Sequence, residues 1–149
     1  MLKIATHEDI ENLIPLFRKF FENSPYKDHK WDEDGVWDTA YRLINDKVNS
    51  VVITYQKEGR PVGIIAGTSC KALFSNEKVS TEIIWWVEEE YRNTKAGLEL
   101  LNALEYWAFN VINASMLSMV CLENNSLERL YTKRGYSKTE SCFIKTKGN

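Results

Sequence analysis

The residues best suited to chemistry lie where a predicted strand meets a predicted helix, in residues 85–101 (WWVEEEYRNTKAGLELL). A polar loop that opens directly into a helix leaves several backbone N–H groups without acceptors at the positive end of the helix dipole. Such a site can hold a phosphate or pyrophosphate group. Arg92 could add a charge-assisted contact, and Gly97 lets a ligand approach the backbone closely. An ordinary capped helix has the same features, so the residues alone leave both interpretations open.

The spacing of apolar residues predicts the elements that position this loop. Residues 10–21 and 98–111 have helical spacing, with Thr6 as the N-cap of the first helix and Pro15 predicting a kink or an interruption inside it. Strands are predicted at 2–4, 50–55, 62–70, 79–87, 114–122 and 141–145, and shorter helices at 36–44 and 127–131, the last stopped by Gly135. The order βααβββαβαβ predicts an α/β fold, a mixed sheet with helices on its faces.

Composition limits the class of protein. The chain has 149 residues, 44% of them hydrophobic, which is the size of one compact domain, and no linker or repeat divides it. We therefore expect a single domain over 1–149. The 19 Lys and Arg against 21 Asp and Glu argue against nucleic acid as a partner, because duplex binding needs a basic face. No apolar run approaches the roughly 20 residues that span a bilayer, so no membrane partner is expected.

The cysteines and histidines exclude several kinds of site. Cys70, Cys121 and Cys142 are scattered and form no C-x-x-C pair, which fits a reduced, cytoplasmic setting. His7 and His29 lie far apart with no cysteine nearby, so no metal site is predicted. The common glycine-rich nucleotide loops and the G-x-S-x-G motif are absent, which excludes the simplest nucleotide-binding and hydrolase interpretations.

Two motifs of the chain follow a known pattern: residues 92–97 (RNTKAG) and residues 124–136 (NNSLERLYTKRGY). The first resembles the acetyl-CoA loop Arg/Gln-x-x-Gly-x-Gly/Ala of the GNAT family of N-acetyltransferases. The second resembles the family's Asn-x-x-Ala-x-x-Leu-Tyr-x-Lys-x-Gly-Phe segment. The motifs come in the family's order and at about its separation, and the predicted element order matches the GNAT fold from end to end. The resemblance implies a central sheet in which two parallel strands splay apart.

The chain departs from the family pattern at three positions. Lys95 stands where the family's loop usually has its first glycine, and Glu89 stands where the family commonly has a proline. Leu127 stands where the family usually has a small residue. Lys95 must therefore adopt a backbone conformation open to a residue with a Cβ, and its ammonium could help to bind a phosphate. Leu127 would narrow the groove for the pantetheine arm.

The resemblance implies transfer of an acetyl group from acetyl-CoA to a primary amine, which attacks directly in a ternary complex. The cosubstrate would bind along the first of the splayed strands and in the loop, at Trp86, Val87, Arg92, Asn93, Thr94, Lys95, Ala96, Gly97 and Asn124. Asn124 could instead be only a helix N-cap. The acceptor is left open as a small-molecule amine or a protein amine, and a homodimer is left open as well.

Two residues are candidates for proton transfer. Tyr131 matches the family's tyrosine, and a phenol with a reference pKa near 10 can protonate the leaving thiolate. Its alternative role is to pack beside Leu130. Glu82 lies five residues before Val87, where many family members carry Glu, and desolvation would suit it as a base. In the alternative interpretation, Glu82 simply faces solvent at the start of the strand. Glu123 is the second candidate for the base.

Acceptor specificity in this family usually comes from the first two helices and the loop between them, here residues 24–37 (SPYKDHKWDEDGVW). Acidic and aromatic groups alternate in it, which could attract and hold a cation. A solvated loop with aromatics packed on the core is the alternative. Two rival functions also stay open: a non-catalytic acyl-CoA-binding or interaction protein, for which Lys95 is the main evidence, and a GNAT-like protein acting on or beside tRNA.

Overall fold

The computed structural model describes residues 1–122 and 127–148, in two compact units, Met1–Met119 and Val120–Asn149. The first unit contains, in order, β1 (Leu2–Ile4), η1 (His7–Asp9), α1 (Ile10–Glu22), α2 (Glu33–Asn45), β2 (Ser50–Lys57), β3 (Arg60–Lys71), β4 (Lys78–Val87), η2 (Glu89–Tyr91), α3 (Ala96–Tyr106), η3 (Trp107–Val111) and β5 (Met116–Ser118). The second unit contains α4 (Leu127–Lys133). A single domain over the whole chain stays a prediction.

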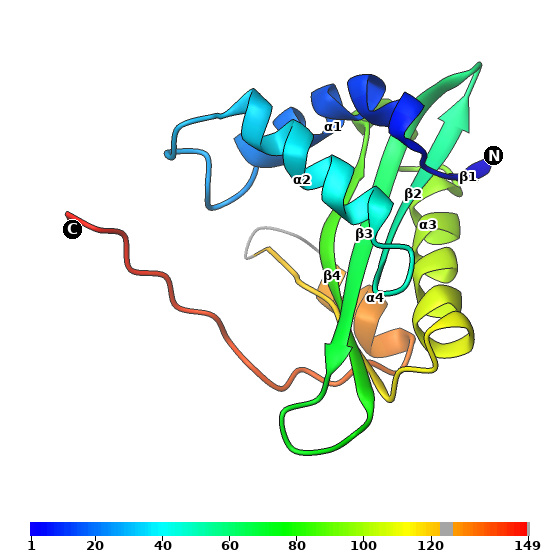
Figure 1. Ribbon diagram of the computed structural model, residues 1–149, viewed down its shortest axis with the longest axis vertical. Coiled ribbons are helices and arrows are strands. Elements are labelled where there is room, and N and C mark those ends of the chain that lie inside the picture. Colours follow the sequence, from blue (N-terminus) through cyan, green and yellow to red (C-terminus); the bar gives the residue numbers. More distant parts are fainter. Residues whose placement is uncertain (123–126, 149) are drawn as a thin grey trace. The chain divides into compact units, whose positions relative to one another are not determined.

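The first unit is built on a five-stranded sheet in the order β1-β2-β3-β4-β5 (Figure 1). Neighbouring strands are antiparallel except β4 and β5, which are parallel, so the predicted mixed sheet is confirmed. β5 pairs with β4 only at Val79–Thr81. In the described part of the chain no strand lies beside residues 82–87 of β4 on that edge. On that edge, β5 therefore accompanies only the first half of β4, and the second half leads into the loop that follows the strand.

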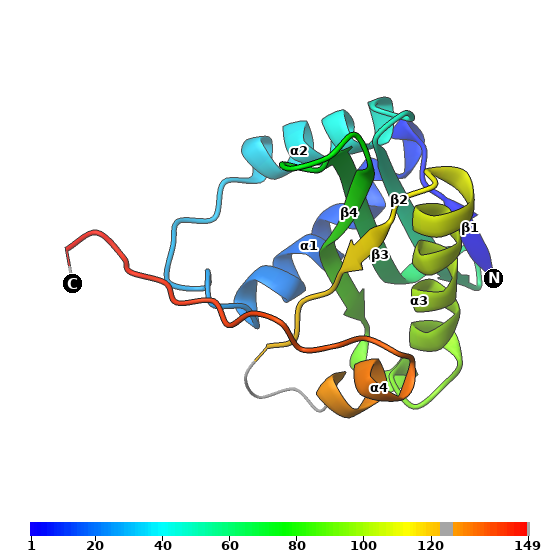
Figure 2. The same ribbon diagram turned by 90° about the horizontal axis from the view of Figure 1, so that it is seen from below.

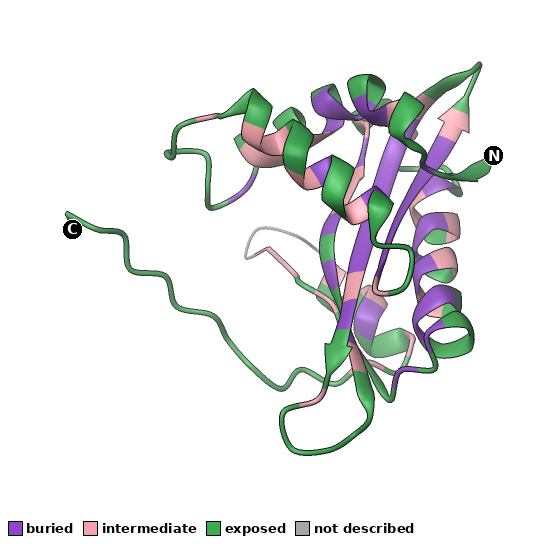
Figure 3. Ribbon diagram, in the orientation of Figure 1, coloured by how far each residue is buried: buried purple, intermediate pink, exposed green. Residues whose placement is uncertain are grey.

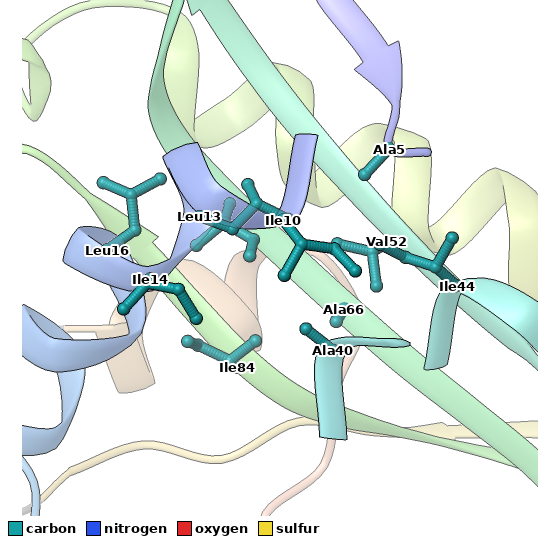
Figure 4. Close-up of a cluster of buried hydrophobic side chains, with 11 residues drawn as sticks. Ala5, Ile10, Leu13, Ile14, Leu16, Ala40, Ile44, Val52, Ala66 and Ile84 are labelled. Atoms are coloured by element: carbon teal, nitrogen blue, oxygen red, sulfur yellow. The ribbon is translucent and has the colours of Figure 1, made fainter. Parts of the chain in front are cut away.

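Helices cover both faces of this sheet. α1 and α2 lie on one face and α3 lies on the other (Figure 2). Between α1, α2 and the sheet is a cluster of buried side chains that includes Ile10, Leu13 and Ile44 (Figure 4). Burial is concentrated along β2 and β3 and on the sides of the helices that face them (Figure 3). The helical spacing in the sequence follows from this arrangement, because each helix buries one stripe against the sheet.

α3 approaches β3 closely because two glycines of that strand face it. A Cβ built on Gly63 would stand 2.9 Å from Leu100 Cδ1, and one on Gly67 would stand 2.8 Å from Leu104 Cδ1. Both leucines are fully buried. The small residues of β3 thus fix how near α3, and the loop in front of it, come to the sheet.

The local signals predicted to begin and end elements are confirmed only in part, since Thr6 is the N-cap of η1 and the N-cap of α1 is Asp9. The β2–β3 turn uses positive φ at Glu58 and Gly59, a combination that suits a tight hairpin. The Asp32 side chain accepts a hydrogen bond from the Gly35 N–H and caps α2. Gly135, with φ +88°, follows α4 as predicted. Pro15, however, does not interrupt α1, which continues to Glu22. Proline has no N–H, so the carbonyl of Glu11, four residues earlier, receives no hydrogen bond within the helix. Glu11 is an exposed residue that water can reach.

Three predicted elements differ in the structure. The helix predicted to reach residue 111 ends at Tyr106 and continues as the π-helix Trp107–Val111. The strand predicted over 114–122 is only Met116–Ser118. The strand predicted at 141–145 is wrong: these residues form no strand with any described residue, and Phe143 is 94% exposed. A short run of apolar residues, Cys142 to Ile144, satisfies the sequence pattern, but a strand also needs a neighbouring strand to pair with its backbone hydrogen-bonding groups.

In the described part of the chain, no helix has both the length and the apolar character that crossing a bilayer requires.

The close approach of α3 to β3 generates a test of the fold. Gly67→Ala should lower the free energy of unfolding by about 1–3 kcal/mol, because the new methyl would press on Leu104 and on Trp107 Cζ3, 3.3 Å away. Urea denaturation measures it. The control is Gly97→Ala, whose Cβ would meet Trp85 and Val87 at an ordinary 3.8 Å. Equal stability of Gly67→Ala and the wild type would contradict the packing described.

Candidate functional site

The loop between β4 and α3 forms the first part of the site. η2 follows β4 after one residue, and α3 begins at Ala96. The Ala96 N–H is bonded to Thr94 Oγ1 at 3.2 Å, and the first bond of the helical pattern runs from the Glu99 N–H to the Lys95 carbonyl. Among the residues that the structure describes, no acceptor faces the N–H groups of Gly97 and Leu98. These two donors point toward whatever lies beyond the helix N-terminus.

Arg92 is folded back on the end of β4. Its Nε donates to the Val87 carbonyl at 3.0 Å, and its guanidinium carbon lies 4.5 Å from the centre of the Trp86 ring. One of its terminal nitrogens is 4.0 Å from the Glu89 carboxylate. The structure therefore brings Trp86, Val87 and Arg92 together, as a ligand site at this strand end would need. The cation–π contact does not follow from the sequence, because only the path of the loop returns residue 92 to residue 86.

Lys95 has the backbone conformation that its side chain requires. Its φ and ψ are −71° and −8°, in the right-handed helical region, so no glycine is needed there. The Lys95 ammonium lies 3.0 Å from Glu99 Oε1 on the first turn of α3. A hydrogen bond to Glu99, with the attraction of its charge, raises the pKa of Lys95 above its usual value. The ammonium is thus a full cation, shared with a carboxylate on the same helix.

Gly97 is not required by packing within the described chain. A Cβ at this position would meet its nearest neighbours, Trp85 and Val87, only at 3.8 Å. The backbone here is helical, so glycine is not needed for an unusual conformation either. Because glycine has no side chain, the space around the Gly97 N–H stays open. This N–H is one of the two that face no acceptor among the described residues.

Glu82 lies in the interior of the first unit. Its exposure is 6%, and it is the one buried charged side chain among the described residues. It stands opposite Gly67 in the β3–β4 ladder, and directly paired residues share a face of a sheet. Because Gly67 faces Leu104 and Trp107, Glu82 lies on the α3 side. The solvent-facing alternative is therefore wrong, whereas a role in proton transfer stays a prediction.

Tyr131 belongs to the second unit and is 7% exposed. Its hydroxyl donates to the Val120 carbonyl at 3.0 Å, and its ring centre lies 5.3 Å from that of Tyr136. The side chain is thus both packed and hydrogen-bonded within its own unit. Asn124 and Glu123 lie outside the described residues.

The loop before α2 uses its acidic and aromatic residues in two ways. Asp32 is the cap of α2, and Trp31 packs against Phe21 with ring centres 5.3 Å apart. Trp37 is 44% exposed and stacks on Tyr41, which in turn stacks on His7 at 4.4 Å. The remaining acidic residues of segment 24–37 are exposed: Asp28 lies in the loop before α2, and Glu33 and Asp34 lie in the first turn of α2.

The described residues contain no group of three His, Cys, Asp or Glu side chains that could hold a metal ion.

Comparison with known proteins identifies the same architecture. Residues 10–136 match the model of the acetyltransferase (GNAT) family. None of the curated proteins matches the chain significantly in sequence. Many solved structures match it in fold.

Three of these structures illustrate the range. A possible acetyltransferase from Clostridium difficile 630 superposes with a TM-score of 0.78 at 14% identity, covering 99% of this chain and 96% of that one. AAC(6')-Iy, in complex with the bisubstrate analog CoA-S-monomethyl-acetylneamine, superposes with a TM-score of 0.79 at 12% identity, covering 99% of this chain and 97% of that one. A ribosomal-protein-alanine N-acetyltransferase from Brucella melitensis biovar Abortus 2308 gives 0.73 at 12%, covering 98% and 99%. At such identities the likeness extends to the fold alone.

Proposed function

The chain belongs to the GNAT acetyltransferase family, and from that premise we propose that it transfers an acetyl group from acetyl-CoA to a primary amine. The observation that supports this most directly is the start of α3, where two backbone donors that face no acceptor among the described residues lie close to Arg92 and the end of β4. Pyrophosphate is an anion suited to such donors. The family's acceptors are amines, and one fold relative carries a CoA-linked bisubstrate analog.

The residues fit acetyl-CoA, and each has a definable task. The N–H groups of Gly97 and Leu98, with Arg92, would hold the pyrophosphate, and the strand end at Val87 would receive the pantetheine arm. Arg92 now occupies the Val87 carbonyl, so binding would have to draw its guanidinium away. The bound thioester supplies the acetyl group, and the protein's contribution is to orient it toward the amine.

Proton transfer completes the proposal. The amine must lose a proton to attack, and Glu82 is the proposed base because it is the buried carboxylate on β4. The departing thiolate must gain a proton, and the Tyr131 hydroxyl is the proposed donor. No covalent enzyme intermediate is needed, since the amine nitrogen bonds to the acetyl carbon as the carbon–sulfur bond breaks.

The setting and acceptor are proposed on separate grounds. The three cysteines form no disulfide in the described structure, which supports a reducing, cytoplasmic compartment. Exposed carboxylates beside Trp37 support a cationic small-molecule acceptor. The decisive experiment is release of free thiol from acetyl-CoA with a panel of amines: release with none of them, despite cosubstrate binding, would favour the non-catalytic alternative.

The phosphate site can be tested without activity. Saturating acetyl-CoA should raise the Tm, with about 2.7 kcal/mol available at a hundredfold excess over Kd. Arg92→Glu should weaken binding about tenfold or more in calorimetry, because it sets a negative charge against phosphate. The control is Arg60→Glu, which makes the same charge change at another site. The Arg60 guanidinium lies 3.5 Å from the Glu90 carboxylate. If neither heat nor a Tm shift is observed with the wild type, acetyl-CoA is not the cosubstrate.

The acidic loop should select cationic acceptors by charge. The apparent KM for a polyamine is expected to rise with ionic strength, because salt screens the attraction. Neutralising Asp28, Glu33 and Asp34 together should raise this KM at low salt and flatten its salt dependence, while Asp32 is kept because it caps α2. Asp38→Asn, a carboxylate paired with Arg42 on α2, is the control. An unchanged KM in the triple variant would show that the loop is only solvated surface.

Tyr131→Phe separates chemistry from packing. We expect kcat to fall by about 10²-fold, the low end of general acid contributions, with acetyl-CoA affinity unchanged. Loss of the bond to the Val120 carbonyl should also cost about 1 kcal/mol of stability. Tyr136→Phe, on the neighbouring ring, is the control. A kcat near that of the wild type, with chemistry rate-limiting, would remove Tyr131 from the mechanism.

A further inference from the structure

Ser80 is a buried hydroxyl without a partner, and it lies next to Glu82 on the sheet. The residue is 0% exposed, and its Oγ has no hydrogen-bond partner in the described part of the chain. Buried hydroxyl groups are almost always bonded, because leaving one unpaired forfeits its hydration without return. A folded chain that keeps such a group carries a cost in stability that alanine at the same position would avoid.

The ladder places Ser80 and Glu82 on one face. Ser80 pairs with Ser69 and Glu82 pairs with Gly67, two residues apart on β3, and the bulge of β4 lies only beyond Glu82. Both side chains therefore lie on the α3 side. Along a strand, residues i and i+2 are about 6.6 Å apart, a gap that a glutamate side chain can close directly or through one water.

The surroundings of Ser80 offer little else to bond. Ser69, directly opposite, donates its own hydroxyl hydrogen to the Val79 carbonyl at 3.2 Å. The residue of β5 that pairs with Ser80 is Leu117, and Leu104 of α3 and Trp107 of η3 lie on the same face at Gly67. Glu82 is the buried side chain of the described structure that can accept a charge-assisted hydrogen bond.

We propose that Ser80 is a positioning residue, whose hydroxyl donates through one water to the Glu82 carboxylate and fixes the orientation in which Glu82 receives the proton of the amine. The inference rests on the proposed function, in which Glu82 is the base. No bond to Ser80 forms or breaks in the reaction, since the proton passes from the amine nitrogen to a carboxylate oxygen.

The test compares Ser80→Ala with Ser69→Ala, two buried serines that face each other across the ladder. Ser80→Ala should lower kcat about tenfold while the KM for acetyl-CoA stays constant. Ser69→Ala, which removes a bonded hydroxyl, should lower the Tm and leave kcat unchanged. Equal kcat in Ser80→Ala and the wild type would overturn the proposal.

A second readout does not depend on activity. The carboxyl ¹³C signal of Glu82, assigned with Glu82→Gln, is followed against pH in the folded protein. A hydroxyl that donates to the carboxylate favours its charged form, so Ser80→Ala should move the titration midpoint upward, and Ser69→Ala should not. An unmoved midpoint in Ser80→Ala would overturn the proposal even in an active enzyme. A moved midpoint in a protein that acetylates no amine would keep the Ser80–Glu82 contact and sink the proposed function instead.

Discussion

The close packing of α3 against β3 is the constraint on which the first unit depends. Gly63 and Gly67 leave the space that Leu100 and Leu104 fill, and those leucines are among the most deeply buried side chains. Because α3 is held at that distance, its first turn stands beside the end of β4, where Val87 and Trp86 lie near Gly97 and Arg92. A bulkier residue in β3 would move the helix and therefore the backbone donors at its N-terminus. The site is built by the packing of the helix behind it as much as by the loop in front.

The cationic side chains of the loop before α3 are paired with other groups of the protein. Two cations, Arg92 and Lys95, stand where an anion would bind, and both are engaged by the protein's own groups, a strand carbonyl and the Glu99 carboxylate. Such contacts satisfy the cations in the empty protein and must be exchanged when an anion arrives. Among the described residues, no group has to be displaced from the backbone amides of Gly97 and Leu98 before an anion binds to them, so these amides bind it at a lower cost in free energy.

Family membership and fold define this protein more closely than they define its substrate. Structures that share its architecture at 12% identity include one in complex with CoA-S-monomethyl-acetylneamine and one named as a ribosomal-protein-alanine N-acetyltransferase. A shared fold therefore does not identify the acceptor, because function depends on the side chains that a fold carries.

The sequence by itself determined the order of the elements, the strand–loop–helix that could bind an anion, and the family. These follow from local rules: apolar spacing sets helix or strand, Gly135 marks the end of a helix, and the motifs are contiguous. The sequence could not decide that Arg92 folds back on Trp86, that Glu82 is buried, or that Ser80 Oγ has no hydrogen-bond partner among the described residues. It also predicted a strand at 141–145 that does not form. Each of these depends on what lies opposite a residue in space, and a strand or a buried polar group is stable only if another part of the chain supplies its partner.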